Sequence, residues 1–260
     1  MNTNKWGPAG WDQLGPVGVK YDHIHEVLQK EYLNTYTILH KIHLSNTETQ
    51  LPCKYCRESY QKFILELPMD RFLASGNLNS WMYQIHNKVN DKLRKQGYNT
   101  KPDPSLKEAT KHVQDVGKDY YKATGWDYIF SIGHNYSETP DAKSMVNAKV
   151  HFSTLPYVLP HPELTSGMIH FMQQHPIDEV LDDRNNLVLW LYLLNQTLLP
   201  VYRKLQPDIN IKHMSYADTC AHYETFRAGC GLSAGKSGPS CRLPVATSVR
   251  NKNLKKLLKF

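Results

Sequence analysis

The distribution of apolar positions predicts a mostly helical chain. After Tyr21, apolar residues recur three or four positions apart, which is the spacing of one helix face. These residues are Ile24, Leu28, Tyr32, Tyr36, Leu39 and Ile42. The period of two that marks a half-buried strand is almost absent from residues 1–112. The pattern therefore indicates one long helix after Tyr21 and the all-α class for this region.

Further helices are predicted in the same region, each ending near a proline or glycine. One is expected over residues 53–67 and another over residues 78–95. The stretch 99–105 holds two prolines and is expected to be a loop, followed by a short helix over 105–113. The opening Trp6-Gly7-Pro8-Ala9-Gly10-Trp11 is expected to place two indole rings near a tight turn.

The rest of the chain divides into two further parts. Residues 113–215 are expected to form a mostly helical accessory domain, whose most apolar helix covers 187–199. From residue 216 the periodicity is lost, and a Gly/Ser-rich stretch precedes a basic end. We therefore expect an N-terminal domain over 1–112, an accessory domain over 113–215 and a tail over 216–260.

The accessory region echoes the first region in order and spacing. The matched pairs are Trp11 with Trp126, Tyr21 with Tyr136, Cys53 with His161, and Trp81 with Trp190. Two interpretations stay open. The accessory domain is either a degenerate copy of the first bundle, without its cysteines, or a helical region whose aromatic residues match by chance.

Composition and charge narrow the classes of function. The 260 residues are 40% apolar, which excludes wholesale disorder. The net charge is +7, but residues 242–260 hold six basic residues and no acidic one, so most of the protein is near neutral. We therefore do not expect nucleic acid as a partner. No apolar run is long enough to span a bilayer, and the first residues lack the pattern of a cleavable signal, so a soluble protein is expected.

Cys53 and Cys56 form a C-x-x-C motif at the start of a predicted helix. The N-terminus of a helix stabilises a thiolate, and this spacing allows a disulfide that opens and closes. A zinc site would need two more ligands, and Cys220, Cys230 and Cys241 lie far away at other spacings. No metal site is expected. A redox pair is favoured, with a pair of buried thiols as the alternative.

A second group of polar residues lies on the helix predicted over 78–95. His86 and Asn90 share one face, and Asn87 lies beside them. Lys92 and Lys95 follow within the next turns. Such a face suits a flat aromatic ligand that carries a phosphate tail. A solvated polar face is the alternative.

Taken in order, these motifs resemble the Erv/ALR family of FAD-linked sulfhydryl oxidases. The matching segments, within residues 6–97, are W-G-P-x-x-W-x-x-L, Tyr21, P-C-x-x-C and W-x-x-x-x-H-N-x-V-N-x-x-L-x-K. The additional C-terminal region is similar to members from large DNA viruses. The resemblance implies a four-helix bundle with a short fifth helix, which binds FAD and forms a homodimer.

The resemblance also implies a role for each matching residue. Cys56 would face the isoalloxazine ring, and Cys53 would accept electrons from the thiols of protein substrates. Molecular oxygen would be the final acceptor and hydrogen peroxide the product. The FAD contacts would be Gly7, Trp11, Tyr21, Trp81 (beside the adenine), His86, Asn87, Asn90, Lys92 and Lys95.

Many members of the family add a shuttle pair of cysteines on a mobile tail. Cys230 and Cys241 are the candidates here, with Cys220 as an alternative partner. A structural disulfide or three reduced thiols are the other interpretations. If the protein is viral, the host cytoplasm or the virion is its expected location. The mitochondrial intermembrane space is the alternative.

The chain departs from the family pattern at two places. Gly15 stands where the family usually has a histidine, and the later structural cysteine pair is absent, with Tyr98 and the proline-rich loop in its place. An alternative function belongs to another class: a non-enzymatic helical protein that has lost flavin and binds an acidic partner through its basic tail.

Overall fold

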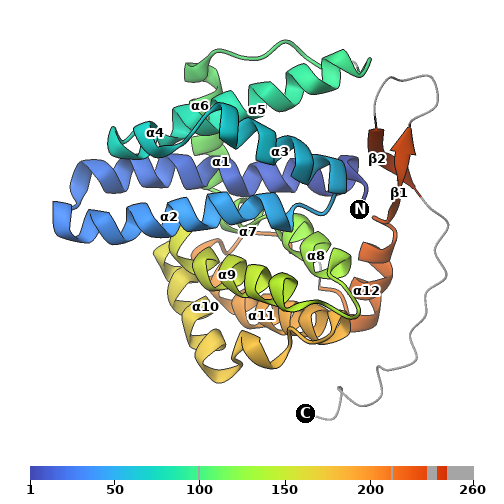
Figure 1. The fold of residues 1–260 in the computed structure, drawn as a ribbon. Helices are drawn as coiled ribbons and strands as arrows, with labels where there is room; N and C mark the ends of the chain where they lie inside the picture. Colours follow the sequence, from blue (N-terminus) through green and yellow to red (C-terminus); the bar gives the residue numbers. More distant parts are fainter. Residues whose placement is uncertain (99, 212, 233–238, 245–260) are drawn as a thin grey trace.

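The computed structural model describes residues 1–98, 100–211, 213–232 and 239–244, with the side chains of those before residue 228. Most of these residues are helical, which confirms the all-α class. Two long antiparallel helices form a middle layer, with helices above and below it (Figure 1). No helix in the described ranges combines the length and the apolar character that a bilayer crossing requires.

The first region supplies the middle layer and one outer layer. Its helices are α1 (Thr3–Val27), α2 (Lys30–Gln50), α3 (Lys54–Glu66), α4 (Asp70–Ala74), α5 (Leu78–Lys95) and α6 (Leu106–Gly117). The helices predicted over 53–67 and 78–95 are confirmed as α3 and α5. The helix α6 begins where predicted, with a capping box of Ser105 and Glu108, and it continues beyond its predicted end to Gly117.

The second region forms the other outer layer, followed by a small hairpin. Its elements are α7 (Tyr120–Thr124), α8 (Trp126–Asn135), α9 (Ala142–Val158), α10 (Pro162–Gln174), the 3₁₀ helix η1 (Ile177–Glu179), α11 (Arg184–Leu205), α12 (Tyr216–Glu224), β1 (Ala228–Leu232) and β2 (Pro239–Pro244). The strands pair antiparallel, with a bulge between Gly229 and Gly231. This pair lies where the sequence shows no periodicity.

The prediction of one long helix through Ile24 and Ile42 is wrong. The chain leaves the helical conformation at Leu28 and Gln29, and α2 returns antiparallel to α1 (Figure 1). Neither residue is a glycine or proline, so the sequence carries no break signal there. Ile42 is 41% exposed, because the buried side of α2 is the polar side that packs against α9.

The tight turn predicted between Trp6 and Trp11 is also wrong, because both residues lie within α1. This helix contains two prolines and several glycines, which disfavour a helix in isolation. Tertiary packing explains its formation. A Cβ atom on Gly15 would lie 2.9 Å from a methyl carbon of Val113, and one on Gly18 would lie 2.9 Å from the Cα atom of Asn79. The glycines therefore let α5 and α6 approach α1 closely.

The two matched tryptophans make the same hydrogen bond in their own regions. Trp81 of α5 donates its indole N–H to the carbonyl oxygen of Leu67, directly after α3, at 2.8 Å. Trp190 of α11 donates to the carbonyl oxygen of His175, directly after α10, also at 2.8 Å. Each tryptophan thus fixes the end of the helix that precedes it in the bundle.

The matched tyrosines, Tyr21 and Tyr136, also make equivalent hydrogen bonds. The hydroxyl of Tyr21 donates to the carbonyl oxygen of Leu73 at 2.9 Å, and that of Tyr136 donates to the carbonyl oxygen of Leu181 at 2.8 Å. Both acceptors lie in the short segment between the third and fourth long helices of their region. The sequence echo therefore coincides with equivalent hydrogen bonds.

The interface between α2 and α9 buries polar side chains. His43 and His151 are fully buried, with ring centroids 4.7 Å apart, and His43 Nδ1 lies 2.9 Å from the hydroxyl of Thr154. The ammonium group of Lys20 on α1 donates to the carbonyl oxygens of Tyr157 and Leu159 at the end of α9. These contacts join the two regions through a continuous interior. Their division into domains at residue 112, which lies inside α6, stays a prediction.

Candidate active site

Cys53 and Cys56 lie at the start of α3, as free thiols. Cys53 has extended backbone angles and is the N-cap residue, so its Sγ accepts a hydrogen bond from the backbone N–H of Cys56 at 3.3 Å. Only 3% of Cys53 is exposed, whereas Cys56 is half-buried. Cys53, which directly follows the Leu-Pro pair, thus caps α3 with its own sulfur.

The two thiols have opposite acidity. A hydrogen bond from the Cys56 thiol to Sγ of Cys53 lowers the pKa of Cys53 to about 7, and the charge of Lys92 acts in the same direction. The same hydrogen bond, together with burial, raises the pKa of Cys56 above its ordinary value. At neutral pH the reduced pair therefore carries its thiolate character at Cys53, where the helix N-terminus favours negative charge.

Lys92 brings a positive charge from α5 to this thiol pair. Its ammonium group donates to the hydroxyl of Ser59 at 2.5 Å and to the carbonyl oxygen of Tyr55 at 3.2 Å, both on α3. These bonds fix the cation one turn from Cys56. An anion formed near the thiols would therefore meet a positioned counter-charge.

A cavity of about 360 Å³ opens beside the thiols, between α1, α3 and α5. We call it the redox cavity. Its lining includes Trp6, Gly7, Trp11, Cys53, Cys56, His86, Asn90 and Lys92. Most of its wall is apolar, with a few polar groups that converge from three helices, which is the usual composition of a small-molecule site.

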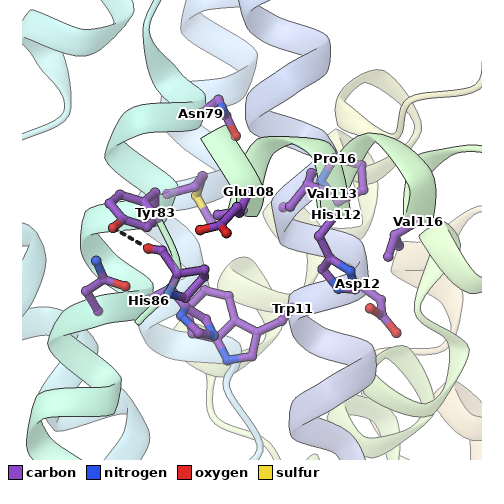
Figure 2. A pocket seen from close by; sticks show the side chains of 15 residues that line it. Trp11, Asp12, Pro16, Asn79, Tyr83, His86, Glu108, His112, Val113 and Val116 are labelled. Atoms are coloured by element: carbon purple, nitrogen blue, oxygen red, sulfur yellow. Dashed lines mark hydrogen bonds between the residues drawn. The ribbon is translucent and has the colours of Figure 1, made fainter. Parts of the chain in front are cut away.

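A second cavity, of about 350 Å³, lies between α1, α5 and α6 (Figure 2). We call it the distal cavity. Its lining includes Trp11, Asp12, Gly15, Tyr83, His86, Asn87, Glu108, His112 and Val113. Trp11 and His86 line both cavities, and their rings meet edge to face with centroids 4.5 Å apart. Burial lowers the pKa of His86, so this shared wall is neutral at pH 7.

An acidic residue that the sequence did not single out organises the polar face of α5. Asp103 accepts a hydrogen bond from the Asn90 amide at 2.7 Å and forms an ion pair with Arg94 at 2.5 Å. The Asn90 amide also lies 3.3 Å from His86 Nδ1. Asp103 therefore orients the side chains that wall the redox cavity.

The proline-rich loop is attached to α5 by polar contacts. Besides the Asp103 contacts, the hydroxyl of Tyr83 donates to the carbonyl oxygen of Pro104 at 2.7 Å (Figure 2). The next residue, Ser105, starts α6. Where the family has a cysteine pair, this chain thus uses an ion pair and hydrogen bonds to hold the loop. The sequence signal for this ion pair is the carboxylate of Asp103, nine residues after Arg94. That spacing indicates a contact only if the loop folds back onto α5.

Three residues predicted to contact the cofactor lie elsewhere. Trp81 and Tyr21 are fully buried in the core, and their polar atoms bond to carbonyl oxygens of the bundle. Trp81 lines neither cavity, and its place beside the adenine stays a prediction. Lys95, the last residue of α5, also lines neither cavity. The other predicted contacts, Gly7, Trp11, His86, Asn87, Asn90 and Lys92, are brought together around the two cavities.

The candidate shuttle cysteines lie in the hairpin. Cys230 is in β1 and Cys241 is in β2, and their side chains are outside the described part. The backbone of β2 lies beside α3 and α1, at the end that carries the thiol pair (Figure 1). Cys220 lies on α12, half-buried, and burial raises the pKa of its thiol.

The comparisons with known proteins address the first region only. No curated protein and no solved structure matches the chain. A family model, described as the Erv1 / Alr family, matches residues 11–111, which include the C-x-x-C motif, α5 and most of α6. This family match agrees with the motif residues and with the two cavities that they line. This part of the chain is therefore similar to the Erv1 / Alr family, which is known for FAD-linked sulfhydryl oxidase activity.

Proposed function

We propose that the protein is an FAD-dependent thiol oxidase that forms disulfide bonds in protein substrates and passes the electrons to oxygen. One observation carries the proposal. The Cys53–Cys56 pair at the N-terminus of α3 opens into a cavity walled by the His86–Asn90 face of α5 and by Lys92. A thiol pair and a mostly apolar cavity lined by one lysine fit a dithiol and a flavin side by side.

The residues present fit FAD. The indole nitrogen of Trp6, in the redox cavity, is buried without a hydrogen-bond partner among the described residues. Buried polar groups normally have partners, so this atom indicates that the redox cavity takes a polar ligand. Two cavities that share Trp11 and His86 suit a ligand with two ring systems.

The chain supplies the groups that would hold the cofactor. Trp11 and His86 would contact it between the two cavities, Asn90 would donate or accept hydrogen bonds, and Lys92 would supply positive charge. When bound, FAD accepts the electron pair of the Cys53–Cys56 dithiol and delivers it to oxygen, which becomes hydrogen peroxide.

Thiol–disulfide exchange describes what the cysteines do. A substrate thiolate attacks Sγ of Cys53 in the oxidised pair, a new sulfur–sulfur bond forms, and the bond to Cys56 breaks. Cys56 leaves as a thiolate, and the charge of Lys92 stabilises it. A second substrate thiolate then displaces Cys53. The substrate gains one disulfide, and the pair gains two electrons and two protons.

We extend the proposal to a shuttle step through Cys230 and Cys241. Cys53 is nearly inaccessible, whereas the backbone of β2 lies beside α3. A hairpin dithiol could therefore carry electrons from bulky substrates to Cys53. The variant Cys230→Ser should slow the oxidation of a reduced protein at least several-fold and leave the oxidation of dithiothreitol nearly unchanged. An equal effect of Cys230→Ser on the oxidation of both substrates would rule out the shuttle.

The accessory region, in this proposal, is a copy of the bundle without a redox centre. Aligned by Trp81 and Trp190, the copy has Leu199 in place of Asn90. Aligned by the residue before the helix, it has His161 in place of Cys53 and Leu164 in place of Cys56. It would serve as a scaffold that packs on α2. A homodimer also belongs to the proposal, as does a location in the host cytoplasm or the virion, with the mitochondrial intermembrane space as the alternative.

The first experiment is the visible absorption spectrum of the purified protein, before and after addition of dithiothreitol in air. Flavin bands that bleach and return while oxygen is consumed are the expected result. A colourless protein that does not take up added FAD would contradict the proposal. It would favour the alternative of a non-enzymatic interaction protein.

A further inference from the structure

The charges around the distal cavity indicate which part of a dinucleotide it accepts. Its lining contains the carboxylates Asp12 and Glu108 and no lysine or arginine. The redox cavity contains Lys92. A pyrophosphate would be repelled by the carboxylates and attracted by the lysine. The distal cavity therefore suits the uncharged adenosine end, whose ribose hydroxyls and amino group can donate to a carboxylate.

The position of α6 excludes any side chain at residue 15. A Cβ atom on Gly15 would lie 2.9 Å and 3.2 Å from the two methyl carbons of Val113. A contact that α1 could otherwise offer to a ligand in this cavity is therefore absent. The wall at this point belongs to α6, so side chains of α6 face the cavity on this side.

His112, next to Val113, is the aromatic residue of α6 that lines the distal cavity. Figure 2 shows its ring on the same side of the cavity as Asp12, across from Trp11 and His86. Its side chain lies at the exposed rim, so a planar ligand can reach the face of the imidazole. Burial raises the pKa of Asp12, although Lys122 and His112 oppose this shift.

We propose that His112 stacks on the adenine ring of the bound FAD, and that α6 thereby supplies the contact that Gly15 cannot make. The proposal rests on the proposed function. In this arrangement α6 determines the preference for FAD over FMN, which has no adenosine end. The flavin ring contacts only the redox cavity, so His112 contributes nothing to its affinity.

The test measures flavin affinity rather than turnover. Flavin-depleted protein is titrated with FAD and with FMN, and binding is followed by quenching of flavin fluorescence. We expect His112→Ala to weaken FAD binding about ten-fold or more, which is the usual effect of removing one base-stacking side chain. FMN binding should stay unchanged. The variant His112→Phe, which keeps a stacking face, should bind FAD within about three-fold of the wild type.

The variant Gln114→Ala is the matched control, since Gln114 is exposed on the same helix and lines neither cavity. An equal loss of FAD and FMN affinity in His112→Ala would overturn the proposal, because it would show a general disturbance of α6. Unchanged FAD affinity would overturn it as well. A wild-type protein that binds no flavin would instead contradict the proposed function.

Discussion

At Cys53 and Cys56, one hydrogen bond distinguishes two thiols of the same helix turn. It lowers the pKa of Cys53 and raises that of Cys56, while Lys92 provides a nearby positive charge. The order of attack in the proposed exchange is the one that the family resemblance implies. Acidity alone would favour Cys53 as the leaving thiolate, and both cysteines line the redox cavity.

The first prediction concerns Cys56→Ser. Turnover should fall at least a thousand-fold, because a serine hydroxyl neither forms a disulfide nor carries the electron pair. Flavin should stay bound, since the cavity walls are unchanged. Oxygen consumption with dithiothreitol and the absorption spectrum check both statements. Measurable turnover in this variant would contradict the proposed electron path.

Local spacing was enough to predict some of these residues and not others. His86 and Asn90 lie one helix turn apart, so their shared face follows from a correct helix prediction. Asp103 and His112 reach the site only because a loop and α6 fold back on α5 and α1, which no local pattern determines. Trp81 matches the motif, but its rotation into the core depends on the packing of α3 against α5.

At the scale of elements, α6 is held at its start by contacts of one loop. Asp103 joins this loop to Asn90 and Arg94, and Tyr83 adds a bond to the carbonyl of Pro104. The ion pair is partly exposed, so its direct contribution to stability is small. Its larger effect is on position, because it fixes the loop against α5, where both line the distal cavity.

The second prediction is that Asp103→Ala weakens FAD binding several-fold, while the melting temperature falls by only about 1–3 °C. The affinity falls because Asn90 loses its acceptor. Asp91→Ala is the control, since Asp91 also pairs with Arg94 but does not contact Asn90. Fluorescence titration and thermal melting provide the readouts. Equal affinities in the two variants would contradict a positioning role for Asp103.

The packing of α2 on α9 buries a pair of histidines, His43 and His151. The apolar stripe in the sequence indicated the opposite face of α2, and Ile42 on that stripe is exposed. Periodicity failed here because the buried residues His40, His43 and Thr47 count as polar. Burial lowers the pKa of His151 to about 3 and that of His43 well below its usual range.

The third prediction concerns acid stability. The ordinary pKa of histidine is about 6.5, so below this pH the unfolded chain binds more protons than the folded chain, whose buried histidines stay neutral. The stability that these neutral histidines contribute is therefore complete above pH 6.5 and falls as the pH decreases. Each histidine contributes at most about 1.4 kcal/mol per pH unit. His151→Phe should reduce the loss between pH 7.5 and pH 5, measured by urea unfolding. The exposed His170→Phe is the control, and an unchanged pH dependence in His151→Phe would contradict this account.

At the scale of the whole molecule, two helical regions share one interior but only the first has the thiol pair. The matched tryptophan and tyrosine hydrogen bonds repeat the same geometry in both. The sequence echo predicted these correspondences. It could not predict that α2 and α9 would pack together, since that contact joins residues about a hundred positions apart.

The fourth prediction is a stoichiometry of one FAD per chain. The second region lacks the cysteine pair and has Leu199 in place of Asn90, so it should bind no flavin of its own. Flavin released by heat and quantified against protein concentration gives the ratio. A ratio near two would contradict the interpretation of residues 113–215 as a copy without a redox centre.

The burial of Cys53 has a kinetic consequence. The backbone N–H of Asn2 donates to the carbonyl oxygen of Phe226, directly before the hairpin, and Met1 lies against Pro52 at the start of the thiol motif. In the proposed exchange, a protein thiol that attacks Cys53 directly, without the hairpin cysteines, must wait until this cover, formed by Met1 and Asn2, separates from Pro52 and Phe226. Turnover of large substrates should therefore follow the opening frequency of the cover and decrease as solvent viscosity rises. It should depend little on how acidic the substrate thiol is.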